Sequence, residues 1–339
     1  MRDYFLRRLL LIPPTLVGVT LIVFFITRIV PGGPIERALA EARQAEMTSR
    51  AGSDASAGTA LSEEQIQQLK EYYGFDKPWY QAYVEWVGKV CRGDLGTSYI
   101  YNEDVWFIIQ SKFPISIYFG IWTLIVTYGV CIPLGILKAI KHNTWVDNWT
   151  SIVIFAGYAI PGYVLGSILI LIFSVQLEWF PLGGFQSENY SELSFFGKIA
   201  DRFYHTALPL ACYLVGSFAF ITLLMKNHLM DNLAADYMRT AVSKGLPFRR
   251  AVFKHAFRNS LIPIATNFGQ NIGLILTGSF LIEVIFDIDG FGLLGFESIV
   301  DRDYPVVMGI LLLSAFLLLV GNIISDILVA LTDPRIRFK

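Results

Sequence analysis

Six long stretches of the chain contain no Asp, Glu, Lys or Arg, and each is rich in aliphatic and aromatic residues. A helix needs about 20 apolar residues to cross the hydrocarbon core of a bilayer, and all six stretches are about that long. The pattern therefore predicts an all-α polytopic membrane protein with six transmembrane helices. The predicted spans are residues 9–27, 115–137, 149–177, 203–225, 259–282 and 304–325.

The segments between the predicted spans carry most of the charge, and its sign depends on the segment. Residues 226–258 contain seven basic and two acidic residues, whereas residues 31–112 contain eight basic and twelve acidic residues. Both chain ends are basic as well. Because basic residues accumulate on the cytoplasmic side of a membrane, we predict that both termini and residues 226–258 are cytoplasmic and that residues 31–112 are external.

The overall composition agrees with a membrane protein. Only 16% of the 339 residues are charged, against about 25% in a typical soluble domain.

The first apolar run follows Arg7 and Arg8, as in a signal peptide, but it is longer than a typical signal core and no small-residue cleavage pattern follows it. Residues 31–34, Pro-Gly-Gly-Pro, instead end a helix. We predict that the first span is retained in the mature protein. We also predict that membrane lipid surrounds the chain and that it has no nucleic-acid partner.

These boundaries divide the chain into four predicted parts. They are a tail and first span (1–30), an external helical insertion (31–114) with a flexible small-residue linker (47–60), a five-helix core (115–330) containing a cytoplasmic loop (226–262), and a cytoplasmic tail (331–339).

The external insertion carries the start and stop signals of two helices. Ser62 and Gln65 have the spacing of a capping box, Gly74 fits a helix C-terminus, and Pro78 can open a second helix. The second helix would carry an apolar, aromatic face made of Trp79, Tyr80, Tyr83, Trp86 and Val87. Two interpretations are equally good: a surface against the membrane interface or a partner, or a small hairpin packing on itself.

The basic cytoplasmic loop has the pattern helix, glycine corner, helix. Asp231 or Asn232 can cap a first helix over 233–244, and Gly245 supplies its C-terminal stop. Pro247 cannot continue that helix but can open a second one that runs to about Asn259. A short polar helix of this kind is rigid enough to be pushed and too polar to enter lipid.

Two of the predicted spans contain features that could border a transport pathway. Pro161 and Gly162 lie near the middle of the third span, where proline kinks a helix. Asn267, Gln270 and Asn271 lie on the fifth span, and the two asparagines share one face. Packing explains both features as well, since membrane helices tolerate proline and use amides to bond neighbouring helices.

Isolated acidic residues offer weaker candidates. Asp326 lies near the cytoplasmic end of the last span, where it could act in transport or pair with a basic neighbour. Glu283 begins an acidic external loop that could meet a binding protein or the amino group of a peptide, and a solvated loop explains it equally well.

Signatures of catalysis are missing from the sequence. None of the four histidines is followed by Glu, so there is no H-E-x-x-H zinc helix, and no G-x-x-x-x-G-K-[ST] phosphate loop occurs. The three cysteines give no disulfide framework. The chain therefore shows no zinc-helix signature of an intramembrane enzyme and cannot hydrolyse ATP through a phosphate loop by itself. A self-contained channel or secondary transporter also fits six spans, although nearly all charges lie at the span ends.

The cytoplasmic loop resembles the EAA loop of the permease subunits of bacterial ABC importers. Ala241 and Gly245 stand at the family's spacing, while Arg239 and Thr240 replace its Glu and Ala. The longer pattern R-T-A-x-x-K-G-L followed by K-H-A-x-R-N-x-x-I-P is similar to the dipeptide and oligopeptide branch. Further motifs in the same order resemble that branch along nearly the whole chain: GFDKP (74–78), GDLGTS (93–98), RDYP (302–305) and DPRI (333–336). Three others, GYAIP (157–161), LIEV (281–284) and ISDI (324–327), look closest to the Yej-type subgroup, which is associated with oligopeptides and the peptide antibiotic microcin C.

The resemblance implies a type I ABC-importer permease in the bacterial inner membrane. Such a chain pairs with a second permease, receives its substrate from a periplasmic binding protein, and docks on ATPase subunits that bind ATP and magnesium. The resemblance also implies that this chain has no catalytic role and no metal or cofactor of its own. It implies a peptide substrate, although nickel, glutathione and sugar systems have permeases of the same branch. The residues that would form the ATPase-coupling helix are Arg239, Thr240, Ala241, Lys244, Gly245 and Leu246.

Overall fold

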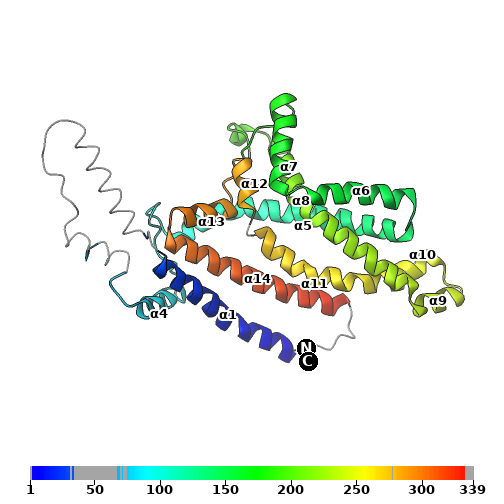
Figure 1. Ribbon diagram of the computed structural model, residues 1–339, viewed down its shortest axis with the longest axis horizontal. Helices are drawn as coiled ribbons and strands as arrows, with labels where there is room; N and C mark the ends of the chain where they lie inside the picture. Colours follow the sequence, from blue (N-terminus) through cyan, green and yellow to red (C-terminus); the bar gives the residue numbers. More distant parts are fainter. Residues whose placement is uncertain are drawn as a thin grey trace. The chain divides into compact units, whose positions relative to one another are not determined.

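A computed structural model describes residues 2–30, 33, 67–68, 71, 75–276 and 278–332, and most of them are helical (Figure 1). The longer helices are α1 (Arg2–Ile29), α4 (Trp79–Val90), α5 (Val105–Ile140), α6 (Trp145–Ala159), α8 (Phe195–Ala234), α11 (Phe257–Leu276), α13 (Phe291–Val300) and α14 (Tyr304–Thr332). The shorter ones are α7 (Gly162–Leu169), α9 (Asp236–Ser243), α10 (Phe248–Ala251), α12 (Phe280–Ile285), two π-helical segments (Ile170–Gln176 and Val252–Ala256) and a 3-10 turn (Tyr190–Glu192).

Four of the described helices, α1, α5, α8 and α14, are long and apolar enough to cross a membrane. The pair formed by α6 and residues 162–176 makes a fifth span if it is counted as one. The predicted fifth run, residues 259–282, is shared between α11 and α12, and its amides make it less apolar than the others. The predicted all-helical membrane fold is therefore confirmed. Among the described residues, four continuous candidate spans and one bent pair stand beside the six spans predicted.

The bend in the third predicted span lies at Pro161, as expected. The helix α6 ends at Ala159, Ile160 is extended with φ −96° and ψ 119°, and α7 begins directly after the proline. The two halves differ in direction by 95°. Proline has no N–H and disfavours helical geometry in the residue before it, which accounts for the extended Ile160 between the two halves.

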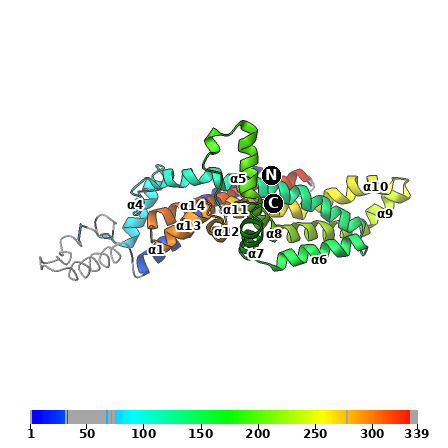
Figure 2. The same cartoon turned by 90° about the horizontal axis from the view of Figure 1, so that it is seen from above.

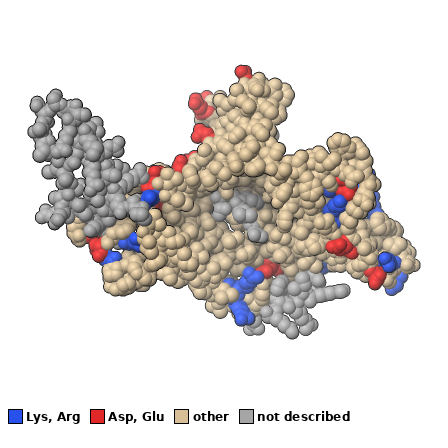
Figure 3. All heavy atoms as spheres, viewed as in Figure 1, with Lys and Arg blue, Asp and Glu red and all other residues tan. Residues whose placement is uncertain are grey.

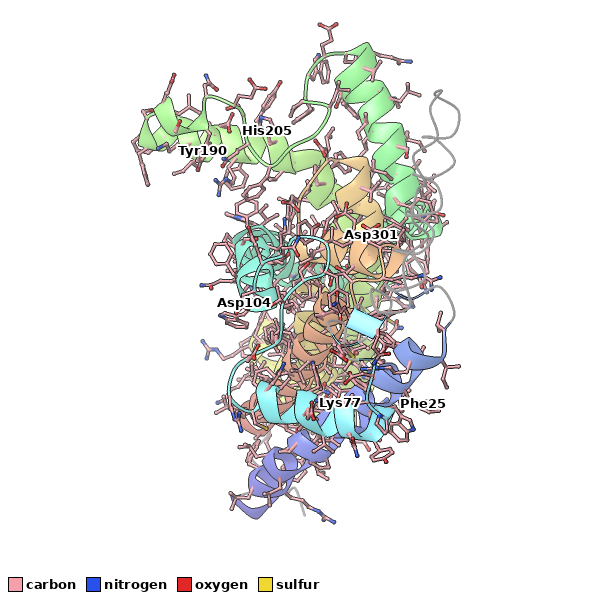
Figure 4. All side chains as sticks on the ribbon, turned by 90° about the vertical axis from the view of Figure 1, so that its left-hand side faces the viewer. Phe25, Lys77, Asp104, Tyr190, His205 and Asp301 are labelled. Atoms are coloured by element: carbon pink, nitrogen blue, oxygen red, sulfur yellow. The ribbon has the colours of Figure 1, made fainter. Side chains whose placement is uncertain are left out.

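Contacts divide the described residues into two compact units. The first contains the described residues of the ranges 1–10, 112–294 and 316–339, and the second contains those of the ranges 11–111 and 295–315. In the second unit α4 packs across α1, and Figure 4 shows Lys77, just before α4, on the same side as Phe25 of α1. The sequence signals at Ser62, Gln65 and Gly74 and the linker 47–60 lie outside the described residues.

The aromatic face predicted for α4 covers α1. Tyr83 is 7% exposed, its hydroxyl donates to the Val17 carbonyl at 2.9 Å and lies 2.9 Å from the Thr20 hydroxyl, and its ring meets Phe24 edge-on. Trp79 makes a similar contact with Phe25. The helix opened by Pro78 is therefore confirmed, and most of its apolar face is used within the chain.

The loop before α5 is tied to the start of α14 within the same unit. The Asp303 carboxylate is buried, and it accepts hydrogen bonds from the Ser98 hydroxyl and from the backbone N–H of Tyr99 at 3.1 Å. A buried carboxylate requires such donors, because an unpaired charge away from water is costly. Asp303 therefore fixes this loop.

Candidate functional site

The helix α8 breaks sharply before the short helix α9, at a position other than the predicted one. Asp231 and Asn232 were expected to cap the new helix, but α8 continues through both to Ala234. The amide of Asn232 is engaged instead, because its Nδ2 donates to the Ser260 hydroxyl at 3.1 Å. The chain turns at Ala235, which is extended, and Asp236 begins α9.

The end of α9 is a hydrogen-bonded reversal at Gly245. The Gly245 N–H donates to the Val242 carbonyl at 2.9 Å, and the Leu246 N–H donates to the Ala241 carbonyl at 3.2 Å. These two bonds form the Schellman motif, in which the residue after the helix is left-handed. Gly245 has φ +87°, so the predicted glycine stop is confirmed.

One face of α9 is anchored in the hydrophobic core of the first unit. Met238 is 3% exposed, and Ala241 and Leu246 pack against the same cluster, which includes Met225 and Leu229 of α8. Ala241 and Leu246 are also the two residues joined by the longer bond of the reversal. Consequently α9 is held on α8 by apolar contacts as well as by the chain connection.

The opposite face of α9 is solvent-exposed and carries the predicted polar residues. Arg239, Thr240, Lys244 and Gly245 are all exposed. Arg239 lies 3.8 Å from the carboxylate of Asp236, but both side chains are so exposed that this ion pair is weak. The six predicted coupling residues thus divide into four on the outer face and two that anchor the helix.

Apolar side chains accompany these polar ones at the surface. Tyr237 is 39% exposed, Val242 43% and Phe248 54%. Figure 2 shows α9 and α10 next to each other after α8. Figure 3 shows charged side chains at the same end of the first unit. A surface of this mixed character is typical of a protein interface, in which arginine and aromatic residues are enriched.

The chain returns from the loop as one continuous helical stretch. Pro247 directly precedes α10, as predicted, but the helix does not end near Asn259, because the π-helical segment joins α10 to α11. Ala251, Val252 and Ala256 are fully buried on its inner side. A surface hollow of about 580 Å³ on its outer side is lined by Pro247, Arg249, Arg250, Phe253 and Lys254.

The two residues at the bend of the third span are placed by packing. Pro161 is exposed, whereas Gly162 lies against α8, and a Cβ atom on Gly162 would stand 2.8 Å from the Cys212 carbonyl oxygen. A larger residue would therefore push α7 away from α8. The bend itself fits either a pathway or a packing role.

The amides of α11, in the predicted fifth span, bond within the protein. Asn267 Nδ2 donates to the Pro263 carbonyl at 2.9 Å, and Asn271 Nδ2 donates to the Tyr128 hydroxyl of α5 at 2.7 Å. The side chain of Gln270 lies outside the described ones. The structure thus gives both asparagines a packing partner, and their role in a translocation path stays a prediction.

Sequence reasoning missed a close approach of α11 and α14. A Cβ atom on Gly269 would lie 1.9 Å from the carbonyl oxygen of Gly321, so the two backbones nearly touch. Ser325 strengthens this contact, because its hydroxyl lies within hydrogen-bond distance of the Ala265 and Thr266 carbonyls. Small residues inside apolar runs are the signal that could have revealed it.

Glu283 is a structural carboxylate. Its side chain is buried and accepts hydrogen bonds from the Tyr213 hydroxyl at 3.0 Å and from the backbone N–H of Leu293 at 2.7 Å and Ser279 at 3.2 Å. It is therefore not available to a binding protein or a peptide. Glu283 itself is not solvated either, because backbone groups of the loop surround its carboxylate, whereas Asp289 of the same loop is exposed.

Asp326 pairs with a basic neighbour, one of the two roles considered for it. Its carboxylate lies 3.1 Å from Arg8 and accepts a hydrogen bond of 3.1 Å from the Tyr4 hydroxyl. The pair joins the start of α1 to the end of α14 within the first unit.

Comparison with known proteins assigns the family. The model of the "Binding-protein-dependent transport system inner membrane component" family matches residues 131–338, which include the bent third span, α9 and the glycine reversal. The chain belongs to this family. It is therefore a multi-pass component of the inner membrane and a permease, which confirms the predicted importer family over the channel or secondary transporter.

Individual relatives are similar to this permease over its whole length. The peptidoglycan transport system permease protein YejB of Agrobacterium fabrum is 38% identical, with 100% of this chain and 99% of the relative covered. The inner membrane ABC transporter permease protein YejB of Escherichia coli O157:H7 is also 38% identical, with both chains covered completely. The oligopeptide transport system permease protein AppB of Bacillus subtilis is 34% identical, again with complete coverage.

Proposed function

We propose that this permease is the membrane subunit of an ATP-driven importer that carries peptides from the periplasm to the cytoplasm. The observation that carries the proposal is α9, a short helix fixed to α8 on one face and exposed on the other. On this proposal, ATPase subunits dock on the exposed face and move the helix.

Peptides are the substrate class that the relatives favour. AppB of Bacillus subtilis is named for oligopeptide transport and DppB of Pseudomonas aeruginosa for di- and tripeptide transport, and this chain matches each along its full length. Within that class, oligopeptides and peptide antibiotics of the microcin C type are the candidates. We expect the path to run beside Pro161, Gly162, Asn267, Gln270 and Asn271.

Coupling requires a surface element that transmits force. The outer face of α9 offers Arg239 and Lys244 as cations and Thr240 as a hydrogen-bonding group, while the reversal at Gly245 keeps the helix short. Because Met238 and Leu246 are packed into the core, a push on α9 would reach α8 directly. ATP and magnesium would be bound by the partner subunits, and this chain would have no catalytic role.

The remaining partners follow from the transport cycle. A second permease chain would form a heterodimer with this one, and a periplasmic binding protein would deliver the peptide. The charge distribution supports cytoplasmic termini and a cytoplasmic α9, with residues 31–114 in the periplasm.

The test is co-purification of the tagged chain with its partners from membranes, comparing wild type with Gly245→Asp. An aspartate at φ +87° is strained, and it adds a negative charge to a basic surface. We expect wild type to bring down a second permease and ATPase subunits, and the variant to lose the ATPase subunits.

Gly93→Asp is the matched control. Gly93 has φ +83°, and neither glycine has a neighbouring atom within 4 Å of an added Cβ, so both substitutions cost similar backbone strain. Gly93 lies in the external insertion, so this variant should retain the ATPase. Loss of the ATPase from both variants, or from neither, would contradict a docking role for the loop.

A further inference from the structure

A buried cluster of charged side chains joins three helices of the first unit. Asp147 of α6 lies at its centre, and both of its carboxylate oxygens are 2.8 Å from the Nζ atom of Lys226 on α8. Lys138 of α5 lies 3.0 Å away on the other side. The carboxylate also accepts the Asn143 N–H at 3.1 Å, and His142 Nδ1 is 3.2 Å from it.

Lys138 is fully enclosed. Its exposed fraction is 0%, and its ammonium group donates to the Asp147 carbonyl at 2.8 Å and to the hydroxyls of Thr150 and Ser151 at 2.8 and 2.7 Å. The side chain of Asp147 is 3% exposed and that of Lys226 is 12% exposed. Among the four side chains of the cluster only His142, at 43%, has substantial contact with solvent.

A cluster of this kind is a costly way to hold helices together. Removing charges from water costs several kcal/mol for each ion, and apolar residues of similar volume often stabilise a protein equally well. What the charged cluster adds is a set of directional hydrogen bonds that fix the position of one helix relative to another. This suits helices whose relative positions must be kept while they move.

The cluster lies close to the proposed coupling helix. Lys226 stands ten residues before Asp236, and α8 runs without a break from Lys226 to Ala234, a distance of about 12 Å along the helix axis. The helices α5 and α8 also touch here, since a Cβ atom on Gly135 would be 2.8 Å from the Thr222 carbonyl oxygen. A displacement of α9 that is transmitted along α8 therefore reaches the cluster before it reaches the middle of the membrane.

We propose that Asp147 is a positioning residue that clamps α5 and α6 to α8, so that a displacement of α9 moves the three membrane helices as one body. The inference rests on the proposed coupling function of α9. The clamp predicts that ATP hydrolysis and transport become separable when the carboxylate is lost, since α8 can then move without its neighbours.

The experiment compares Asp147→Asn with wild type in the complete transporter, reconstituted with its second permease, ATPase subunits and loaded binding protein. ATP hydrolysis and uptake of a labelled oligopeptide are measured on the same proteoliposomes. We expect the number of peptides transported per ATP to fall severalfold while hydrolysis continues. Lys226→Arg should keep the wild-type ratio, because it preserves the ion pair.

Two further variants guard against simple misfolding. Asp147→Asn leaves Lys138 buried without its counter-charge, so the triple variant Lys138→Met, Asp147→Asn, Lys226→Met removes all three charges together. It should assemble and still show the low ratio. Asp231→Asn changes an exposed carboxylate on α8, the helix that carries Lys226, and should behave as wild type.

The outcomes separate the clamp from the proposed function. A wild-type ratio in both Asp147→Asn and the triple variant would overturn the clamp alone, as would hydrolysis and uptake that fall together in proportion to the assembled complex. Wild-type uptake that does not depend on ATP would overturn the coupling function of α9 and the clamp with it.

Discussion

Glu283 shows at the level of a single residue how a membrane protein keeps a buried carboxylate. The backbone N–H groups of Ser279 and Leu293 and the Tyr213 hydroxyl donate to it, and Gly278 and Gly290 leave the space that it occupies. A Cβ atom on Gly278 would stand 2.1 Å from a carboxylate oxygen. The two glycines therefore make room for the carboxylate, and its hydrogen bonds fix the turn between α11 and α12.

Tyr213→Phe should destabilise the chain by about 1.5–3 kcal/mol, the range for a hydrogen bond to a charged group. The hydroxyl donates to Glu283 at 3.0 Å and accepts the Ser279 N–H at 3.1 Å, and both bonds are lost. The measurement is the apparent melting temperature of the purified chain in detergent. Tyr204→Phe, on the same helix but exposed, is the control. Equal melting temperatures for all three proteins would refute the role of Tyr213.

At the scale of whole elements, the sequence predicted most helices but not their contacts. Apolar runs and proline positions are local signals, so the spans, the bend at Pro161 and the stop at Gly245 could be derived from them. The cap was misplaced at Asp231 or Asn232 because the partner of Asn232, Ser260, is distant in sequence. For the same reason no local sequence signal linked Lys138 to Asp147 or Lys226, which lie on other helices.

The glycine contact between α11 and α14 gives a prediction at this scale. Gly269→Ala places a methyl group 1.9 Å from the Gly321 carbonyl oxygen, so the helices must separate. Overpacking of this kind costs about 1–3 kcal/mol or more. Gly129→Ala on α5 has no atom within 4 Å of the added carbon and should be neutral. Thermal unfolding of each chain, purified alone, would contradict the contact if Gly269→Ala were as stable as the control.

At the scale of the whole molecule, the proposed mechanism requires α9 and the external insertion to face opposite sides of the membrane. The distribution of basic residues supports that arrangement. The native cysteines allow it to be tested by chemical labelling. Cys91 follows α4 and is exposed, whereas Cys131 and Cys212 are buried in membrane helices. A membrane-impermeant maleimide should therefore label the native chain at Cys91 alone.

Labelling of intact spheroplasts tests the orientation directly. We expect Cys91 to react from outside, and Cys91→Ser to abolish the signal. Lys244→Cys in the Cys91→Ser background places a thiol on the exposed end of α9, and it should react only in inside-out vesicles or after the membrane is opened. Because the buried thiols stay silent in both preparations, each signal belongs to one side. Reaction of Lys244→Cys in intact spheroplasts would place α9 outside the cell, where no ATPase could reach it.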